Sequence, residues 1–337
     1  MKEKGKRKSD LRSSIILLLI LLLLLITSTY AWFTANRTVT ISTLDVHIEA
    51  QGGLQISTDA VNWKSIISTE DIKAGYKDAA EANRIDTNQV PSDMEAVSTI
   101  GEIDENGKMA MYYGTVLANE TTGLDELTAT LETDAQGTNG KYIAFDIFLK
   151  ADNDYNLKMT KDSNVIQQEG KTETGIKQAA RVAFCHHGTQ PVGTAVNTLR
   201  TMSKTDAAVY IWEPNSNLHT AAASAHAKSA YGIDNLAYDG TAAAVEYYGI
   251  NQAITTGVEL SKTNNGGDTS FTKVTPNYKT TAGEDGAMVE EGCDIFGITK
   301  GVTKLRVYMW IEGQDVDCEN TASGSDISFN LELEVKE

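Results

Sequence analysis

The sequence contains few cysteines, which could crosslink a small domain, and few prolines, which would stiffen loops. There are three cysteines and four prolines among 337 residues. Cys185, Cys293 and Cys318 cannot all pair within one chain, and they lack the close spacing typical of zinc sites. One internal disulfide at most is expected, and its pairing cannot be ranked from sequence. The fold must therefore depend on a hydrophobic core, for which about 300 residues are sufficient.

Motifs of the common enzyme classes are also missing. The sequence has no H-E-x-x-H, G-x-S-x-G, phosphate-binding loop or kinase motif. Its histidines are His47, His186, His187, His219 and His226. Neighbouring cysteine and histidine at positions 185 and 186 point to opposite faces of a strand, which disfavours a nucleophile and base pair. We therefore predict a protein without catalytic residues or cofactor, and the weaker alternative is a secreted hydrolase.

Basic residues are scarce beyond the N-terminus. The chain has 29 Lys and Arg against 46 Asp and Glu, and its formal net charge is −17. Without residues 1–31, 23 basic and 44 acidic residues remain. Such a charge repels nucleic acid and anionic lipid, so we expect neither as a partner.

The one long apolar run lies near the N-terminus. Six basic residues precede an unbroken apolar stretch over residues 15–26, and the polar residues 27–29 follow. This arrangement is typical of a signal peptide, with cleavage predicted between Ala31 and Trp32 by signal peptidase. The alternative is an uncleaved membrane anchor over residues 13–33. In both cases we expect an extracellular or cell-surface protein.

Apolar residues alternate with polar ones in the clearest segments of the remaining chain. Residues 327–335, 305–311 and 143–149 each have this period of two, which predicts strands with one buried and one wet face. Shorter strands are expected over 178–185 and 208–212. Near the N-terminus the apolar phase changes between Ile41 and Leu44, which predicts a β-bulge around Ser42 and Thr43.

These patterns predict an all-β fold. We expect residues 32–337 to form a single jelly-roll-like antiparallel β-sandwich, preceded by the signal or anchor helix. Loops and insertions are expected over about 60–135 and 186–300, where the apolar pattern is weak. The best helical candidate is residues 221–230. Hairpin turns are predicted at residues 104–107 and 139–140.

A resemblance to a known family is carried by the N-terminal segment. Residues 30–34 (Tyr-Ala-Trp-Phe-Thr), followed by residues 42–46 (Ser-Thr-Leu-Asp-Val), are similar to the leader junction and first strand of TasA/camelysin-like proteins. These are secreted bacterial proteins with a jelly-roll sandwich, several of which build biofilm-matrix fibres. The resemblance covers residues 10–50, and the rest of the chain is similar only in architecture. It implies a Gram-positive surface or matrix protein that forms fibres.

The same resemblance suggests how copies could join. Once the leader is removed, the segment after Trp32 is an apolar, strand-forming N-terminus that must be buried somewhere. It can pair with its own sheet or add to a sheet of the next subunit. The residues of this expected assembly strand are Val39, Ile41, Leu44, Val46 and Ile48.

Acidic residues near the C-terminus suggest a weak calcium site. Asp315, Asp317 and Glu319 alternate, and Asp326 follows eleven residues after the first. Asp152, Asp154 and Asn156 alternate similarly. Both stretches depart from the EF-hand pattern, because neither has the required Gly and final Glu. Turn-forming acidic loops are the ordinary alternative.

The leading prediction is a non-enzymatic exported surface or matrix protein whose partner is itself or related matrix subunits. The alternative is a monomeric adhesin or glycan-binding module that contacts cell-wall polysaccharide. Its candidate sugar-stacking residues are aromatic, and they are Tyr112, Tyr113, Trp212, Tyr247, Tyr248 and Trp310.

Overall fold

The computed structural model describes most of the chain beyond the leader. The described residues are 39–48, 54–76, 87–134, 137–167, 174–228, 232–237, 245–263, 266–277, 280–282, 288–290, 293–318 and 326–336, with 39–48, 280–282, 288–290 and 336 described by their backbone alone. The predicted leader, with Ala31 and Trp32, lies outside these residues. No helix within the described part is long and apolar enough to cross a membrane.

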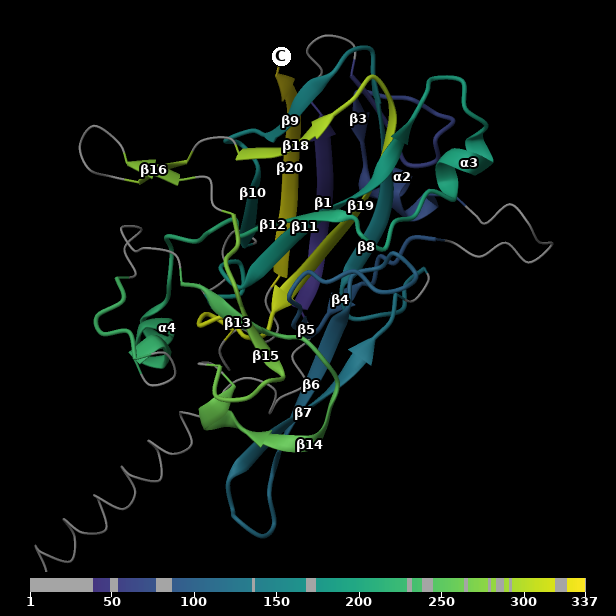
Figure 1. Cartoon of the computed structure of the whole chain (residues 1–337). Coiled ribbons are helices and arrows are strands. Elements are labelled where there is room, and N and C mark those ends of the chain that lie inside the picture. Colours follow the sequence, from purple (N-terminus) through teal and green to yellow (C-terminus); the bar gives the residue numbers. More distant parts are fainter. Residues whose placement is uncertain are drawn as a thin grey trace, which may run out of the picture.

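Two sheets form the body of the molecule (Figure 1). The seven-stranded sheet, called sheet A, has the order β18-β9-β20-β1-β3, with β10 also on β20 and β4 also on β1. Its strands are β1 (Val39–Ile48), β3 (Ile66–Ile67), β4 (Asp93–Met94), β9 (Tyr155–Met159), β10 (Asn164–Gln167), β18 (Cys293–Ile298) and β20 (Asp326–Lys336).

The six-stranded sheet, called sheet B, has the order β12-β11-β19-β8-β2, with β5 also on β19. Its strands are β2 (Gln55–Ser57), β5 (Ala96–Val97), β8 (Ile143–Ala151), β11 (Ala180–Gln190), β12 (Ala208–Trp212) and β19 (Gly301–Glu312). The strands predicted over 143–149, 178–185, 208–212, 305–311 and 327–335 are all present.

The main core lies between the two sheets. It contains Phe145, Ile147 and Leu149 of β8 and Phe329 and Leu331 of β20, together with the matching alternate residues of β11 and β19. Along β20 the buried residues alternate with partly exposed Ser, Asn and Glu, as the sequence pattern predicts. The all-β sandwich is thus confirmed, with its core where alternation placed it.

The N-terminal strand differs from a purely antiparallel arrangement. β1 pairs parallel with β20 over eight register positions, from Thr40 opposite Asp326 to Ile48 opposite Leu333. On its other side β1 pairs with β3 and β4. The register shifts between Ile41 and Thr43, which confirms the predicted β-bulge. The predicted antiparallel sandwich thus contains two parallel pairs, this one and the short pair of β5 with β19.

The regions expected to be mainly loop contain further paired strands. A three-stranded sheet has the order β14-β7-β6, with β6 (Met111–Ala118), β7 (Asp125–Glu132) and β14 (Ile254–Glu259). Two smaller pairs are formed by β13 (Tyr247–Ile250) with β15 (Phe271–Val274) and by β16 (Thr280–Ala282) with β17 (Met288–Glu290). The strands of the two smaller pairs have only three or four residues each, which is too few for a clear period of two.

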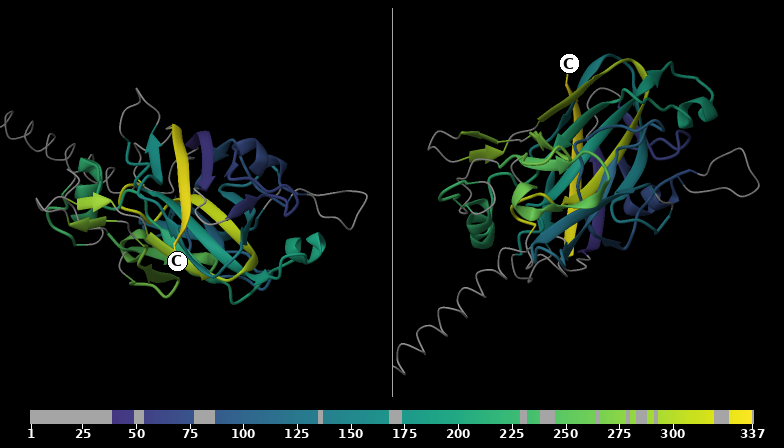
Figure 2. Two further views of the ribbon diagram at one scale, coloured as in Figure 1. Left: turned by 90° about the horizontal axis from the view of Figure 1, so that it is seen from above. Right: turned by 60° about the horizontal axis from the view of Figure 1, so that its bottom comes forward.

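The helices are short and peripheral. They are α2 (Thr69–Ala74), α3 (Val196–Arg200), α4 (Ala221–His226) and the 3-10 helix η2 (Leu260–Lys262). Figure 2 shows α3 and α4 on opposite sides of the sandwich. The helix predicted over 221–230 is present as α4, and residues 229 and 230 lie outside the described part.

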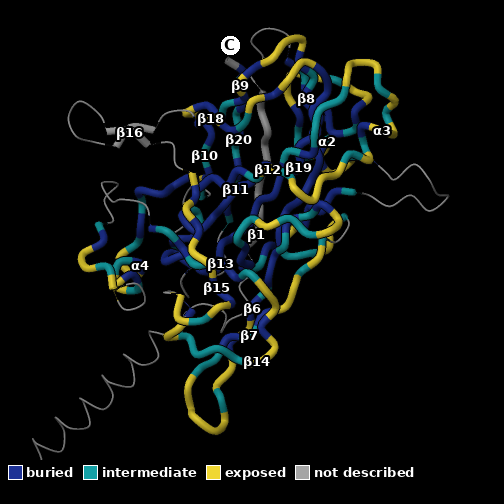
Figure 3. The backbone as a smooth tube through the Cα atoms, viewed as in Figure 1, coloured by how far each residue is buried: buried dark blue, intermediate teal, exposed yellow. Residues whose placement is uncertain are grey.

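The two sheets differ in what covers their outer faces. β19 is buried along its whole length, including Arg306, Tyr308 and Trp310, whereas a wet face was predicted for these residues. Chain from the segments 87–134 and 196–204 covers them, and Figure 3 shows the dark central strands beneath more exposed surroundings. The outer face of β20 stays partly exposed. Polar residues of β19 therefore lie in the protein interior.

Candidate functional site

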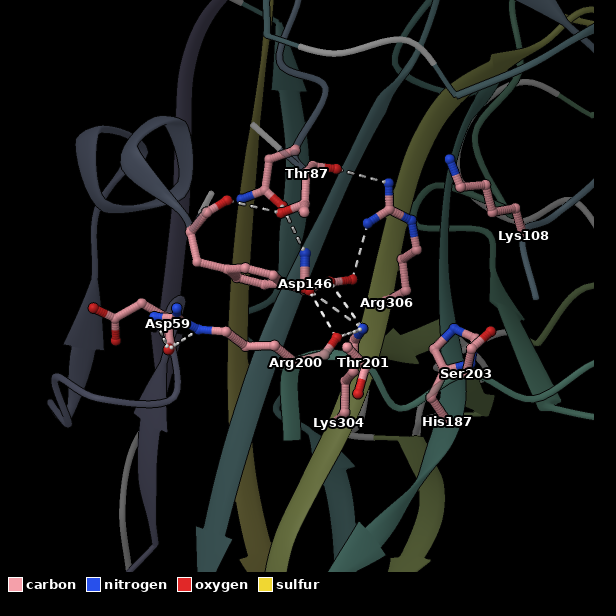
Figure 4. Close-up of polar contacts among 12 residues, drawn as sticks. Asp59, Thr87, Lys108, Asp146, His187, Arg200, Thr201, Ser203, Lys304 and Arg306 are labelled. Carbon is pink, nitrogen blue, oxygen red and sulfur yellow. Dashed lines mark hydrogen bonds and ion pairs between the residues drawn. The ribbon is translucent and has the colours of Figure 1, made fainter. Parts of the chain in front are cut away.

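The covered face of sheet B carries a charged cluster, called the Asp146 cluster (Figure 4). Arg306 and Lys304 of β19 both point toward Asp146 of β8. Arg306 Nη1 lies 2.9 Å from Asp146 Oδ1, and Lys304 Nζ lies 3.1 Å from Asp146 Oδ2. The register of β8 with β19 places Arg306 directly opposite Asp146. All three side chains are buried.

Loops beyond the sheet complete this cluster. The Tyr76 hydroxyl donates to Asp146 Oδ2 at 2.6 Å. Lys304 Nζ donates to the carbonyl oxygen of Arg200 at 2.7 Å, and Arg306 Nη2 donates to that of Thr87 at 3.3 Å. The cluster therefore fastens three separate segments onto sheet B.

Asp134 connects the cluster to a cavity. Arg306 donates to Asp134 Oδ2 from Nε at 3.0 Å and from Nη2 at 2.8 Å, and the Tyr142 hydroxyl donates to Oδ1 at 2.5 Å. Asp134 also lines a cavity of about 260 Å³, together with Asp104, Lys108, Glu132 and five further residues. Burial raises the pKa of the Glu132 carboxyl, which Lys141 counteracts.

Opposite charges within the Asp146 cluster favour the ionised forms of Asp146 and Arg306. Burial alone would raise the pKa of Asp146, but the charges of Lys304 and Arg306 hold it well below its ordinary value. Burial opposes the charged form of Arg306, but Asp134 and Asp146 raise its pKa well above normal. Each charged group has an opposite charge at 3.1 Å or closer. Asp146 and Arg306 are therefore stabilised in their charged forms, which fits an ion pair that holds structure together.

The neighbouring cysteine and histidines do not form a catalytic pair. Burial raises the pKa of the Cys185 thiol, which packs among apolar side chains. Burial and the charge of Lys304 lower the pKa of His187 to about 4, and its Nδ1 accepts from the Lys204 amide at 3.1 Å. A buried thiol with a raised pKa near an imidazole with a lowered pKa fits a packed cysteine. All three cysteines are buried, and none of them is in a disulfide.

A second charged group, called the Arg181 cluster, lies where β11 begins and β12 and β19 end. Arg181 is fully buried and its Nη2 forms ion pairs with Asp315 and, at 3.1 Å, with Glu213. Its Nη1 donates to the carbonyl oxygens of Gln178 and Ala180 at 2.8 and 3.0 Å. The Tyr247 ring lies 5.6 Å from the guanidinium carbon.

The turn after β19 supplies the remaining members. Glu312 accepts from Trp310 Nε1 at 3.0 Å and from the Gln314 amide at 2.9 Å. Asp317 accepts from the Thr220 amide at 3.0 Å, and its Oδ2 lies 2.7 Å from His219 Nδ1. These contacts fasten the segment that leads into α4 onto the sandwich.

Carboxyl groups outnumber cations in the Arg181 cluster, and this perturbs their pKa values. Burial raises the pKa of Glu213 to about 8 although Arg181 opposes the shift. Burial likewise raises the pKa of Glu312 to about 7 and that of Asp317 to about 6. Glu213 Oε2 and His219 Nε2 are buried without a hydrogen-bond partner. This cluster, unlike the first, changes its charge near neutral pH.

The predicted calcium residues are only partly brought together. Asp315 pairs with Arg181 and Asp317 with His219, while Asp326 begins β20 and Glu319 lies outside the described residues. Among the residues that the structure describes, no group of three or more His, Cys, Asp or Glu is arranged to hold a metal ion. In the second stretch, Asp152 accepts from the Tyr155 hydroxyl and Asp154 from the Lys300 amide. Calcium binding therefore stays a prediction, and the positions of these acidic residues do not support it.

The candidate sugar-stacking aromatics are mostly interior. Trp212 and Trp310 are fully buried, and Tyr247 and Tyr112 are nearly so. Tyr113 and Tyr248 are half-buried. The expectation that the two tryptophans present a sugar-binding surface is wrong, because Trp212 lies in the main core and Trp310 lies under the segments that cover sheet B.

Sequence reasoning missed the central members of both clusters, which are Asp146, Arg181, Glu213, Lys304 and Arg306. The sequence feature that could have revealed them is a charged residue inside an otherwise apolar strand, as in Ile143–Ala151 and Ala180–Gln190. A buried charge needs a partner, so such charges indicate covered ion pairs.

Comparison of the chain with models of protein families, with curated protein sequences and with solved structures finds no match. Any function must therefore be argued from the residues themselves. The described charge clusters fasten loops to the sandwich.

Proposed function

We propose that this protein is a non-enzymatic, exported component of the cell surface or extracellular matrix, which assembles with copies of itself by exchanging its N-terminal strand. The proposal combines the predicted leader and the TasA/camelysin-like junction with one structural observation. That observation is the position of β1 in the interior of sheet A, between β20 and the short strands β3 and β4.

The pairing of β1 makes it suited to exchange. It comes from the N-terminal end of the described chain and pairs with a strand from the C-terminal end, Asp326–Lys336. Removing β1 would leave the main-chain groups of β20 without their partner. The β1 strand of another copy supplies identical groups, so exchange forms the same contacts at little cost. Head-to-tail exchange does not close and gives a filament.

The charged groups of the described chain favour a structural function over a catalytic one. Asp146, Lys304 and Arg306 are buried and paired. Cys185 is a buried thiol with a raised pKa. A catalytic group must reach substrate, which these contacts prevent.

Strand exchange can be tested with paired cysteines in the mature chain from Trp32. Asp45 of β1 lies opposite Asn330 of β20 in the register. We expect the double variant Asp45→Cys/Asn330→Cys, oxidised after assembly, to give a ladder of covalent multimers on non-reducing gels. Oxidised as a fresh monomer, it should close within the chain, which locks β1 in place. Electron microscopy of the unlocked chain should show filaments.

The matched control pairs the same Asp45→Cys with Glu334→Cys, four positions out of register on the same strand. This control should give no ladder. If the in-register variant gives only internally crosslinked monomer at every concentration, and the mature protein forms no filaments, β1 completes its own sandwich and the proposal is wrong.

A further inference from the structure

The hairpin of β6 and β7 extends beyond the rest of the described chain at the bottom of Figure 1. Its strand β6 is the edge of the sheet β14-β7-β6 and pairs along its length only with β7. On the other side, Tyr112 exchanges main-chain hydrogen bonds with Ser98 at 2.8 and 2.9 Å. β6 is therefore protected at its start and not farther along.

Strand geometry shows which groups of β6 face this second side. Main-chain groups of alternate residues point to opposite sides of a strand, so Val116 and Ala118 point the same way as Tyr112, away from β7. Among the described residues, neither has a main-chain partner on that side. Gly114 is buried, whereas Thr115, Leu117 and Ala118 are exposed. The open edge therefore runs from Thr115 to the hairpin tip, where Figure 3 shows exposed chain.

The composition of this edge is unusual for an exposed strand. Met111–Ala118 contains no charged residue. Edge strands are normally protected from pairing by charges, prolines or bulges. Leu117 is 66% exposed, and three of the seven large exposed apolar residues of the described chain, Leu117, Leu124 and Leu131, belong to this hairpin.

We infer that β6 pairs antiparallel with β6 of a second copy, about a two-fold axis at Leu117. In this register Val116 lies opposite Ala118 of the other copy, and the outward groups form about four main-chain hydrogen bonds. The two Leu117 side chains meet across the axis, which removes both from water. A two-fold contact uses the same surface of both copies, so it forms a closed dimer.

Charge is the reason for choosing a second copy as the occupant. The chain carries −17, so copies repel one another over most of their surface. An uncharged strand opposite itself places no like charges together. The acidic residue opposite Leu117 in the hairpin, Glu126, accepts from Asn119 Nδ2 at 2.8 Å. This contact is separate from exchange of β1 and does not depend on it.

The experiment uses the oxidised monomer of Asp45→Cys/Asn330→Cys, in which exchange is blocked. A single strand pair belongs to the small interface class, below about 1,200 Å². We therefore expect a weak, reversible dimer, visible by sedimentation only toward the upper end of roughly 1 to 500 µM protein. Adding Leu117→Asp should weaken the dimer at least about tenfold, equivalent to 1.4 kcal/mol.

The matched control is Leu131→Asp, the same change at an exposed leucine of the same hairpin on β7, away from the open edge. It should leave the dimer intact. A locked chain that stays monomeric, or equal weakening by both substitutions, would overturn the inference. An unlocked chain that forms no ladder but still dimerises through Leu117 would contradict only strand exchange.

Discussion

At the level of single residues, the two charged clusters differ in whether their charges balance. Asp146 lies between Lys304 and Arg306, which offset the cost of removing its charge from water. Glu213 shares the single guanidinium of Arg181 with Asp315, and one of its oxygens has no partner. The first cluster is therefore expected to be insensitive to pH near neutrality, and the second sensitive.

Substituting Glu213 tests this difference. Its pKa is about 8 in the folded chain against 4.5 as the ordinary value. Between these values the folded chain binds more protons than the unfolded chain, so the free energy of unfolding should fall as pH rises from about 4.5 to 8. Glu213→Gln stays neutral throughout. We expect urea unfolding of the variant to show a smaller fall, by up to about 1.4 kcal/mol per pH unit.

The control for this series is Glu70→Gln, on the exposed surface of α2, which should leave the pH dependence of the parent chain unchanged. Glu312 and Asp317 titrate in the same direction, so the variant should retain part of the slope. Identical slopes for Glu213→Gln and the parent would show that Glu213 is ionised in the folded chain.

At the level of elements, β19 shows how far alternation predicts a strand and where it stops. Leu305, Val307, Met309 and Ile311 face the core as the period of two predicts. The opposite face was expected to be wet, because Arg and Glu normally contact water. Segments far away in the sequence cover it, and their approach depends on tertiary packing that a local pattern does not contain.

Substituting Arg306 tests how strongly the contacts between β19 and the segments that cover it stabilise the fold. Arg306→Met keeps the approximate length of the side chain but removes the nearest cation of the buried Asp134 and leaves Asp146 with Lys304 alone. We expect a loss of about 3–5 kcal/mol in the free energy of unfolding. Lys64→Met is the matched control, because it removes a cation from a partly exposed pair with Asp71 and should cost at most about 1 kcal/mol. Similar losses in both variants would contradict a structural role for the cluster.

Other features of the fold also divide into those that depend on neighbouring residues and those that depend on residues far away in the sequence. The bulge between Ile41 and Thr43 and the turn in which Asp104 accepts from the amides of Asn106 and Lys108 were predictable, because each depends on neighbouring residues. The parallel partner of β1 was not, because alternation gives the faces of a strand and not its neighbour. Asp315 and Asp317 were noticed as acidic residues, but their partners Arg181 and His219 lie about 100 or more positions away.

At the level of the whole molecule, self-association has to overcome charge. The sequence pI is about 4.7, and the chain without its leader is more acidic than the whole. Both proposed contacts between copies, the exchanged β1 and the β6 edge, use main-chain hydrogen bonds and apolar side chains. The β6 edge contains no charged residue, and exchange of β1 replaces contacts within one chain by identical contacts between copies. Long-range repulsion is therefore the electrostatic force that opposes both contacts.

Salt should therefore strengthen self-association of the mature chain. Raising sodium chloride from about 20 to 300 mM shortens the distance over which charges act to below about 10 Å. We expect sedimentation to show tighter association at the higher salt, and a steeper salt dependence for Leu117→Asp, which places two added charges near the axis. Potassium chloride should act equally, because screening depends on ionic strength. Association that weakens with salt would mean that ion pairs hold the copies together, which would contradict both contacts.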